Sequence, residues 1–171
     1  MADRRLTGVL LVGGASSRFG SPKALIEFEG ETLAERGWRT LAAICDEVLA
    51  VGKTADALPL PFPLVDDGTT ERAPIYGVIA GLAVAKHEVV VFLPVDCPLV
   101  TPEVVRALGE AVAVSQTGPL PGAYTKTMLT ALRVRTASGW LSLRGVNSAV
   151  LDIDEGLLAD VDVPCDLVRL A

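Results

Sequence analysis

Short apolar runs alternate with longer stretches that have helical spacing along the first two thirds of the chain. Four runs have the length of strands: 7–12, 47–52, 62–65 and 89–96. The last of them is apolar on both faces, as central parallel strands are. Residues 32–45 and 73–85 have the spacing or the small-residue content of helices. This alternation predicts an α/β fold, a Rossmann-like and mostly parallel sheet with helices on both faces.

The last third of the chain is patterned less regularly. Thr101 can cap a helix that has Pro102 at its first position, so a helix is expected over 101–114. After a Gly- and Pro-rich stretch, further elements are expected: a strand at 122–124, a helix around 126–134, a strand near Val150, and a short strand, a turn and a helix between 160 and 170. Neither an internal repeat nor a second domain is visible, so residues 1–171 are interpreted as one domain.

Composition excludes several classes of function. A formal net charge of −6 argues against a broad surface that follows the phosphates of DNA or RNA, because such surfaces concentrate Lys and Arg. Cys45, Cys97 and Cys165 are widely spaced, so neither a disulfide framework nor a zinc site is indicated and a reducing cytoplasm is expected. The apolar run at 9–12 is shorter than the ~7-residue core of a signal peptide. No stretch approaches transmembrane length, so no membrane association is expected.

The loop after the first strand, in LLVGGASSRFGSPKAL (residues 10–25), combines glycines with two cations. Gly13 and Gly14 let the backbone turn sharply and leave its N–H groups open to a phosphate or a base. Arg18 and Lys23 supply positive charge for charge-assisted hydrogen bonds. The pattern therefore indicates a polyphosphate site, although it fits neither the Walker A nor the dinucleotide-binding spacing. A Gly-rich connection with solvated Arg and Lys is the alternative.

Acidic residues follow two other predicted strands. Asp96 ends a central strand, at the sheet edge where open α/β folds bind ligands, and a carboxylate there is a candidate Mg²⁺ ligand. Asp66 and Asp67 offer a further acid at that edge, and which of the two is functional stays open. All three could instead be turn or capping residues. The lone His87 has no GxSxG motif beside it, so phosphoryl or nucleotidyl transfer is favoured over acyl transfer.

These motifs resemble those of the molybdenum cofactor guanylyltransferases over nearly the whole chain. LVGGASSRFGSPKAL is similar to LAGGxSxRMGxDKA, VFLPVDCPLVTPEVV to LxLPCDxPxLxPxxV, APIYGVIAGL to GPLAGIxxGL, and VDVPCDL to NxNTPEDL. The resemblance implies a nucleotidyltransferase domain that transfers GMP from GTP to the phosphate of molybdopterin and releases pyrophosphate, with Mg²⁺ as cofactor. Transient contact with cofactor-delivery proteins or molybdoenzymes is a further expectation.

Individual roles follow from position in these motifs. The resemblance implies nucleotide contacts at Leu11, Val12, Gly13, Gly14, Lys23, Asp66 and Asp96, catalytic roles for Arg18, Lys23 and Asp96, and Asp96 as the Mg²⁺ ligand. Trp38 is expected in the core, because large aromatic residues are mostly buried, and a contact patch between molecules is the alternative. A monomer or weak oligomer is therefore expected.

The chain departs from the guanylyltransferase pattern at three positions. Pro22 replaces the usual acid before the lysine, and Pro-Lys is commoner in the cytidylyltransferases of the same cofactor. Gly52 stands near a frequent asparagine, and Ala73 replaces the first glycine of GPLAG. These departures weaken the choice of base, so a cytidylyltransferase, or a nucleotidyltransferase acting on a sugar or other phosphate, is the alternative. A nucleotide-binding module without turnover is an alternative of a different class.

Overall fold

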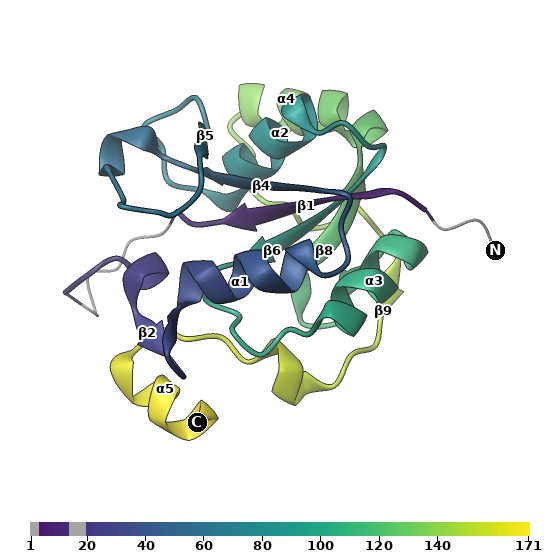
Figure 1. The fold of residues 1–171 in the computed structure, drawn as a ribbon. Helices are drawn as coiled ribbons and strands as arrows, with labels where there is room; N and C mark the ends of the chain where they lie inside the picture. Colours follow the sequence, from purple (N-terminus) through teal and green to yellow (C-terminus); the bar gives the residue numbers. More distant parts are fainter. Residues whose placement is uncertain (1–3, 14–19) are drawn as a thin grey trace.

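A computed structural model gives the fold, and the structure describes residues 4–13 and 20–171. In these residues a seven-stranded sheet has the order β5-β4-β1-β6-β8-β7-β9 (Figure 1). The strands, in that order, are Leu64–Asp66, Glu47–Gly52, Leu6–Leu11, Val89–Pro94, Gly118–Thr125, Val114–Ser115 and Val150–Leu151. Every pairing is parallel except those that β8 makes with β6 and β7. The predicted mostly parallel α/β sheet is therefore confirmed.

Parallel pairing brings the carboxyl ends of β5, β4, β1 and β6 to one edge of the sheet. Leu11, the last residue of β1, pairs with Val51 on one side and Pro94 on the other. Hydrogen bonds continue one residue further, from Val12 N to Val51 O and from Val95 N to Leu11 O. The loops that leave these strands therefore start side by side.

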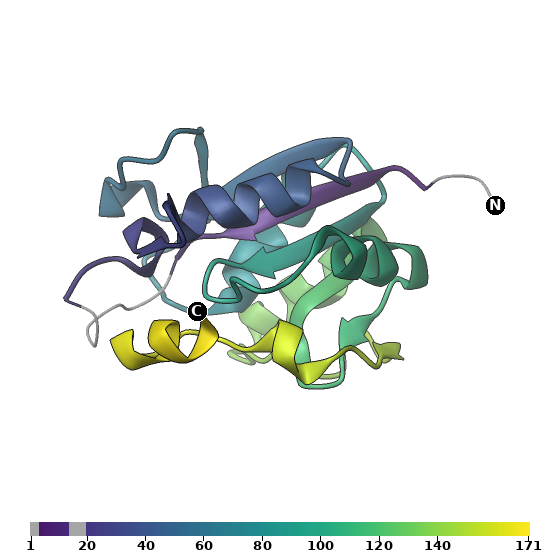
Figure 2. The same ribbon diagram turned by 60° about the horizontal axis from the view of Figure 1, so that its bottom comes forward.

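Helices cover both faces of the sheet, as predicted. α2 (Pro74–Val84) and α4 (Leu129–Ala137) lie on one face, and α1 (Leu33–Ala42) and α3 (Pro102–Ala111) lie on the other (Figures 1 and 2). Both views place α5 (Pro164–Leu170) toward the end of the molecule to which β1 points.

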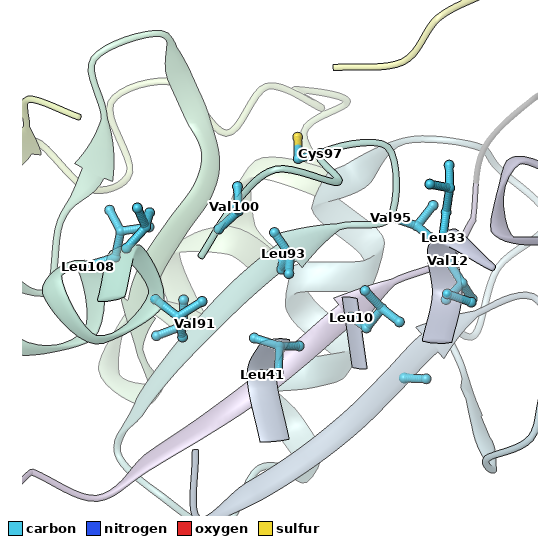
Figure 3. Close-up of a cluster of buried hydrophobic side chains, with 14 of the residues drawn as sticks. Leu10, Val12, Leu33, Leu41, Val91, Leu93, Val95, Cys97, Val100 and Leu108 are labelled. Carbon is cyan, nitrogen blue, oxygen red and sulfur yellow. The ribbon is translucent and has the colours of Figure 1, made fainter. Parts of the chain in front are cut away.

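The alternation of side chains along the central strands builds two cores. Leu10 and Val12 point to the α1 and α3 face, where they pack with residues such as Leu41 and Leu93 (Figure 3). Leu11 belongs to the second core, beneath α2 and α4. Burying each large aliphatic side chain contributes about 1.5–3 kcal/mol, so the central strands form a rigid base for the loops at their ends.

The helix start predicted at Thr101 is confirmed, and α1 also begins after a capping threonine, Thr32. Thr32 accepts a hydrogen bond on its side chain from Glu35 N at 3.1 Å, and Glu35 accepts in return from Thr32 N at 2.8 Å. This capping box satisfies backbone donors that the first turn of α1 leaves unpaired. Thr101 caps α3 through Val104 N at 3.3 Å, with a proline at the first helical position.

Several predicted boundaries are wrong. The strand expected at 62–65 is formed at Leu64–Asp66, because Pro61 and Pro63 have no N–H for a ladder. The helix expected over 101–114 ends at Ala111, since Val112 has a left-handed φ of 48° and the chain turns into β7. The expected helix near 126–134 begins as a 3-10 turn over Lys126–Met128 before α4.

Other elements differ from the pattern because long-range contacts decide them. The strand expected at 122–124 extends over Gly118–Thr125, where it pairs with β6 and β7. A hairpin of β2 (Glu27–Phe28) and β3 (Glu31–Thr32) was not predicted. The structure assigns no strand at 160–163, where Val161 N instead donates to Asp96 O at 2.8 Å. Among the described residues, no helix has the length and apolar content needed to cross a membrane.

Candidate functional site

A cavity of about 660 Å³ lies at the carboxyl edge of the sheet, a volume typical of small-molecule sites. It extends from the loop after β5 to the start of β8, across the ends of β4, β1 and β6. Residues that line it include Gly13, Lys53, Asp67, Asp96, Leu120 and Asp160. The sequence prediction that the ligand site lies at this edge agrees with the position of the cavity.

Lys23 and Asp96 form one end of the cavity. Lys23 lies in the 3-10 turn Lys23–Leu25, and its Nζ atom is 3.6 Å from Asp96 Oδ2 and 3.2 Å from Asp162 Oδ1. The side chains of Lys23 and Asp96 are 15% and 30% exposed. The structure thus brings together the predicted cation and the predicted acid, in contact with each other.

Burial raises the pKa of the Asp96 carboxyl above its ordinary value. The nearby ammonium of Lys23 opposes this shift, and the carboxylate of Asp160 adds to it. An ionised Asp96 is therefore only partly compensated by the protein, which favours the binding of a further cation.

The C-terminal segment brings two more carboxylates to this end. Val161 N donates to Asp96 O, which holds Asp160 and Asp162 beside the end of β6. Asp166 in turn accepts hydrogen bonds from Asp162 N and Val163 N, both at 2.9 Å, and pairs with Arg169. The pKa of Asp166 is lowered, first by the Val163 N–H bond, so a charged cap fixes this segment.

A buried ion pair forms the wall at the other end of the cavity. Lys53 follows β4 directly, and its Nζ atom lies 2.8 and 3.0 Å from the two carboxylate oxygens of Asp67. Both side chains are 9% exposed. Arg72 lies on the same side and pairs with Asp56 at 2.8 Å. This end therefore contains cations that are already paired within the chain.

Asp66 is not among the residues that line the cavity, whereas its neighbour Asp67 is. The exposed Asp66 carboxylate accepts hydrogen bonds from Thr54 N, from the Thr54 hydroxyl and from Gly68 N, at 2.7 to 2.9 Å. These bonds, the Thr54 hydroxyl first, lower its pKa to about 2. Its position is that of a turn residue, and Asp67 is the acid that the fold presents to the cavity.

The other predicted nucleotide contacts lie at the end of β1. Leu11 and Val12 line the cavity while their side chains are buried in the two cores, so their backbone faces it. Gly13 passes close to Gly52, where a Cβ atom would lie 2.8 Å from Val12 Cγ2. Glycine at 52 therefore leaves room for the Val12 side chain. Gly14 and Arg18 lie outside the described residues.

Sequence reasoning missed several lining residues. Lys53 could have been found, because it directly follows a correctly predicted strand and so reaches the ligand-binding edge. Asp160 was missed because its segment was expected to form a strand. Leu120 was missed because it lies in the Gly- and Pro-rich stretch. Both reach the cavity through contacts between residues far apart in the sequence.

The described residues contain no cluster of three or more His, Cys, Asp or Glu side chains arranged as metal ligands. His87, which is half-buried, is not among the residues that line the cavity. A metal at this site would therefore have to share its ligands between the protein and a substrate, as Mg²⁺ does with phosphates.

The family model and the curated relatives that match this chain point to one family. A family model described as the MobA-like NTP transferase domain matches residues 8–145. A protein of Aquifex aeolicus (strain VF5) named "Probable molybdenum cofactor guanylyltransferase" is 33% identical over 96% of this chain and 89% of its own length. The molybdenum cofactor guanylyltransferase of Pseudomonas syringae pv. syringae (strain B728a) is 27% identical, over 95% and 92% respectively. Molybdopterin-guanine dinucleotide biosynthesis protein A from Archaeoglobus fulgidus shares the fold, with a TM-score of 0.79, 21% identity and 96% of each chain covered.

Proposed function

The chain belongs to the MobA-like NTP transferase family, and on that premise we propose that it transfers GMP from GTP to the phosphate of molybdopterin. A phosphate oxygen of the acceptor forms a bond to the α-phosphorus of GTP, and the bond from that phosphorus to the β-phosphate bridging oxygen breaks. The products are pyrophosphate and the guanine dinucleotide form of the cofactor. The observation that carries this proposal is the contact of Lys23 with Asp96 in a cavity at the carboxyl edge of the sheet.

The side chains at this end would act through position and charge. On binding of the triphosphate, the Lys23 ammonium would exchange a carboxylate partner for phosphate oxygens and neutralise the charge that grows on the leaving pyrophosphate. Arg18, in the same loop, is proposed to assist it. No covalent intermediate with the protein is needed, because the reaction is a single displacement between two phosphates.

The residues present fit Mg²⁺. A hard cation takes oxygen ligands, and Asp96 offers a carboxylate whose charge Lys23 compensates only in part. We propose Asp96 as the protein ligand, with the remaining ligands from phosphates and water. When bound, Mg²⁺ would polarise the phosphate oxygens and lower the barrier to attack on the α-phosphorus.

The proposed nucleotide contacts run along the cavity from Lys23 and Asp96 toward Lys53 and Asp67. The backbone at Leu11, Val12 and Gly13 would face the nucleoside, with Gly14 beside them in the loop. Asp67 takes the place that the resemblance gave to Asp66, because Asp67 lines the cavity. Four expectations stay predictions from sequence: one nucleotidyltransferase domain over 1–171, a cytoplasmic location, a monomer or weak oligomer, and contact with proteins that deliver or receive the cofactor.

The test is release of pyrophosphate by the purified chain with molybdopterin, Mg²⁺ and each of GTP, CTP, ATP and UTP. We expect release with GTP and little with the others. Release only with CTP would show a cytidylyltransferase instead. Binding of nucleotides without release, or release only with a sugar phosphate as acceptor, would reject molybdopterin guanylyl transfer.

A further inference from the structure

We propose that Lys53 is a positioning residue that fixes the nucleoside end of the cavity through Asp67 and does not contact the phosphates. The inference rests on the proposed function for the identity of the ligand. It assigns a role to a cation that would otherwise be taken for a second phosphate-binding lysine.

The Lys53 ammonium uses all three of its N–H donors within the chain. A lysine ammonium has three N–H donors, and three acceptors surround this one: both carboxylate oxygens of Asp67, at 3.0 and 2.8 Å, and Thr69 O at 2.7 Å. Lys53 as a whole is only 8% exposed. A phosphate could bind it only by breaking a buried ion pair, which leaves the partner carboxylate unpaired and is strongly unfavourable.

These hydrogen bonds hold the segment after β5 in place. The segment after β5 is attached to β4 twice, by Asp67 N donating to Gly52 O at 2.8 Å and by the Lys53 side chain. Thr69 N also donates to Asp67 Oδ1 at 3.2 Å, which closes the turn. The same segment leads to Arg72 and Ala73, which line the cavity just before α2 begins. Lys53 therefore fixes one whole wall of the site.

This wall lies several strands away from the end of the cavity that holds Lys23 and Asp96. Asp67 follows β5 and Asp96 follows β6, and β4 and β1 lie between them in the sheet. With neighbouring strands about 4.8 Å apart, the ends of β5 and β6 are roughly 14 Å apart across the edge. We take a ligand whose phosphates lie at Lys23 and Asp96 to place its nucleoside at the wall of Lys53 and Asp67, because the cavity continues from one pair to the other.

The Asp67 carboxylate can still accept a hydrogen bond from a ligand. Asp67 Oδ1 accepts from both Lys53 and Thr69, whereas Oδ2 accepts from Lys53 alone among the described residues. One acceptor position on Oδ2 is thus left for a ligand. It suits an N–H of a base or an O–H of a ribose and repels phosphate oxygens, which have no proton to donate.

The test compares binding of guanosine and of pyrophosphate to the full chain by titration calorimetry. Lys53→Met should weaken guanosine and GTP about tenfold and leave pyrophosphate unchanged, because only a positioned hydrogen bond to the nucleoside is lost. The KM for GTP should rise while kcat per folded molecule stays within about twofold. Lys23→Ala should show the opposite pattern, with weaker pyrophosphate and unchanged guanosine. Lys86→Met, at an exposed lysine remote from the cavity, is the matched control.

A second variant keeps the test decisive if Lys53→Met does not fold. The double variant Lys53→Met/Asp67→Asn removes the buried charge along with its partner, and it should fold and show the same loss of guanosine binding. Weaker pyrophosphate binding in either variant would show that Lys53 contacts phosphates, and unchanged guanosine binding would show a role in stability alone; each result overturns the proposal. If the parent prefers another nucleotide, the guanylyl assignment fails, and the same comparison with that nucleoside still decides the role of Lys53.

Discussion

The Nζ atom of Lys23 lies 3.6 Å from the carboxylate of Asp96 and 3.2 Å from that of Asp162. The cation expected to bind phosphate and the acid expected to bind metal therefore form an ion pair, in which the Lys23 ammonium compensates part of the charge of Asp96. Both groups must change partners when Mg²⁺ and a triphosphate bind. Mutation of each residue can therefore test its proposed role separately: phosphate binding for Lys23 and metal binding for Asp96.

Lys23→Ala should lower turnover by on the order of 10²-fold, the effect of removing one preorganised electrostatic group. The fold should be retained, because Lys23 lies in a short turn outside the two cores. Steady-state kinetics together with thermal melting will check this, with Lys86→Ala as the control for loss of a remote positive charge. Wild-type turnover in Lys23→Ala would remove this residue from the phosphate site.

Asp96→Asn should reduce Mg²⁺-dependent turnover by orders of magnitude, because the carboxylate is the proposed metal ligand. Since burial raises the pKa of Asp96, ionising this carboxyl is less favourable in the folded chain than in the unfolded chain. The melting temperature of the variant should therefore equal or exceed that of the parent. GTP affinity without Mg²⁺ should be unchanged or higher, since a negative charge has been removed.

Turnover per folded molecule separates this outcome from a purely structural role of Asp96. If Asp96 only formed a turn before Pro98, the variant would melt at a lower temperature and its folded fraction would keep full activity. Normal turnover in folded Asp96→Asn would exclude Asp96 from the site.

Asp66 should affect stability against acid more than catalysis. Its folded pKa of about 2 lies below its ordinary value of 3.8, so it stabilises the fold above pH 4 and this stabilisation is lost as the pH falls toward 2. Asp66→Asn should therefore melt at a lower temperature than the parent at pH 7, with the difference shrinking toward pH 2. The KM for GTP should not change. A higher KM with unchanged melting would support nucleotide binding by Asp66.

Trp38 is half-buried and stacks on Phe62, with ring centroids 4.2 Å apart and planes within 9°. Its aromatic face is thus covered within the chain, which agrees in part with the expectation that Trp38 lies in the core. We predict a monomer or weak oligomer by light scattering across a concentration series. A dimer whose mass does not depend on concentration would contradict this prediction.

Local patterns were sufficient for much of the fold. Strand 47–52 was predicted to the residue, and the capped start of α3 at Thr101 followed from residue types alone. The errors occur where distant pairing or a single backbone angle decides, as at β8 and at Val112. Such features depend on contacts that no window of sequence contains.

The same division holds for the site. Lys23 and Asp96 were each recognisable from their motifs, but their contact is a property of the sheet order. Asp66 and Asp67 are adjacent in the sequence, which does not show which of them reaches the site. In the structure, the turn in which Asp66 accepts from Thr54 leaves Asp66 exposed and places Asp67 in the cavity wall. Asp160 enters through the hydrogen bond from Val161 to Asp96, which no pattern indicates.

The most direct test of guanylyl transfer follows the phosphates of GTP. The purified chain is incubated with molybdopterin, Mg²⁺ and GTP that is labelled at either the α- or the γ-phosphate, and the products are separated. We predict that the α label enters a molybdopterin guanine dinucleotide, that the γ label leaves as pyrophosphate, and that neither happens without Mg²⁺ or with Asp96→Asn. Release of the γ label as orthophosphate, or an α label that stays in GTP while pyrophosphate is absent, would contradict it.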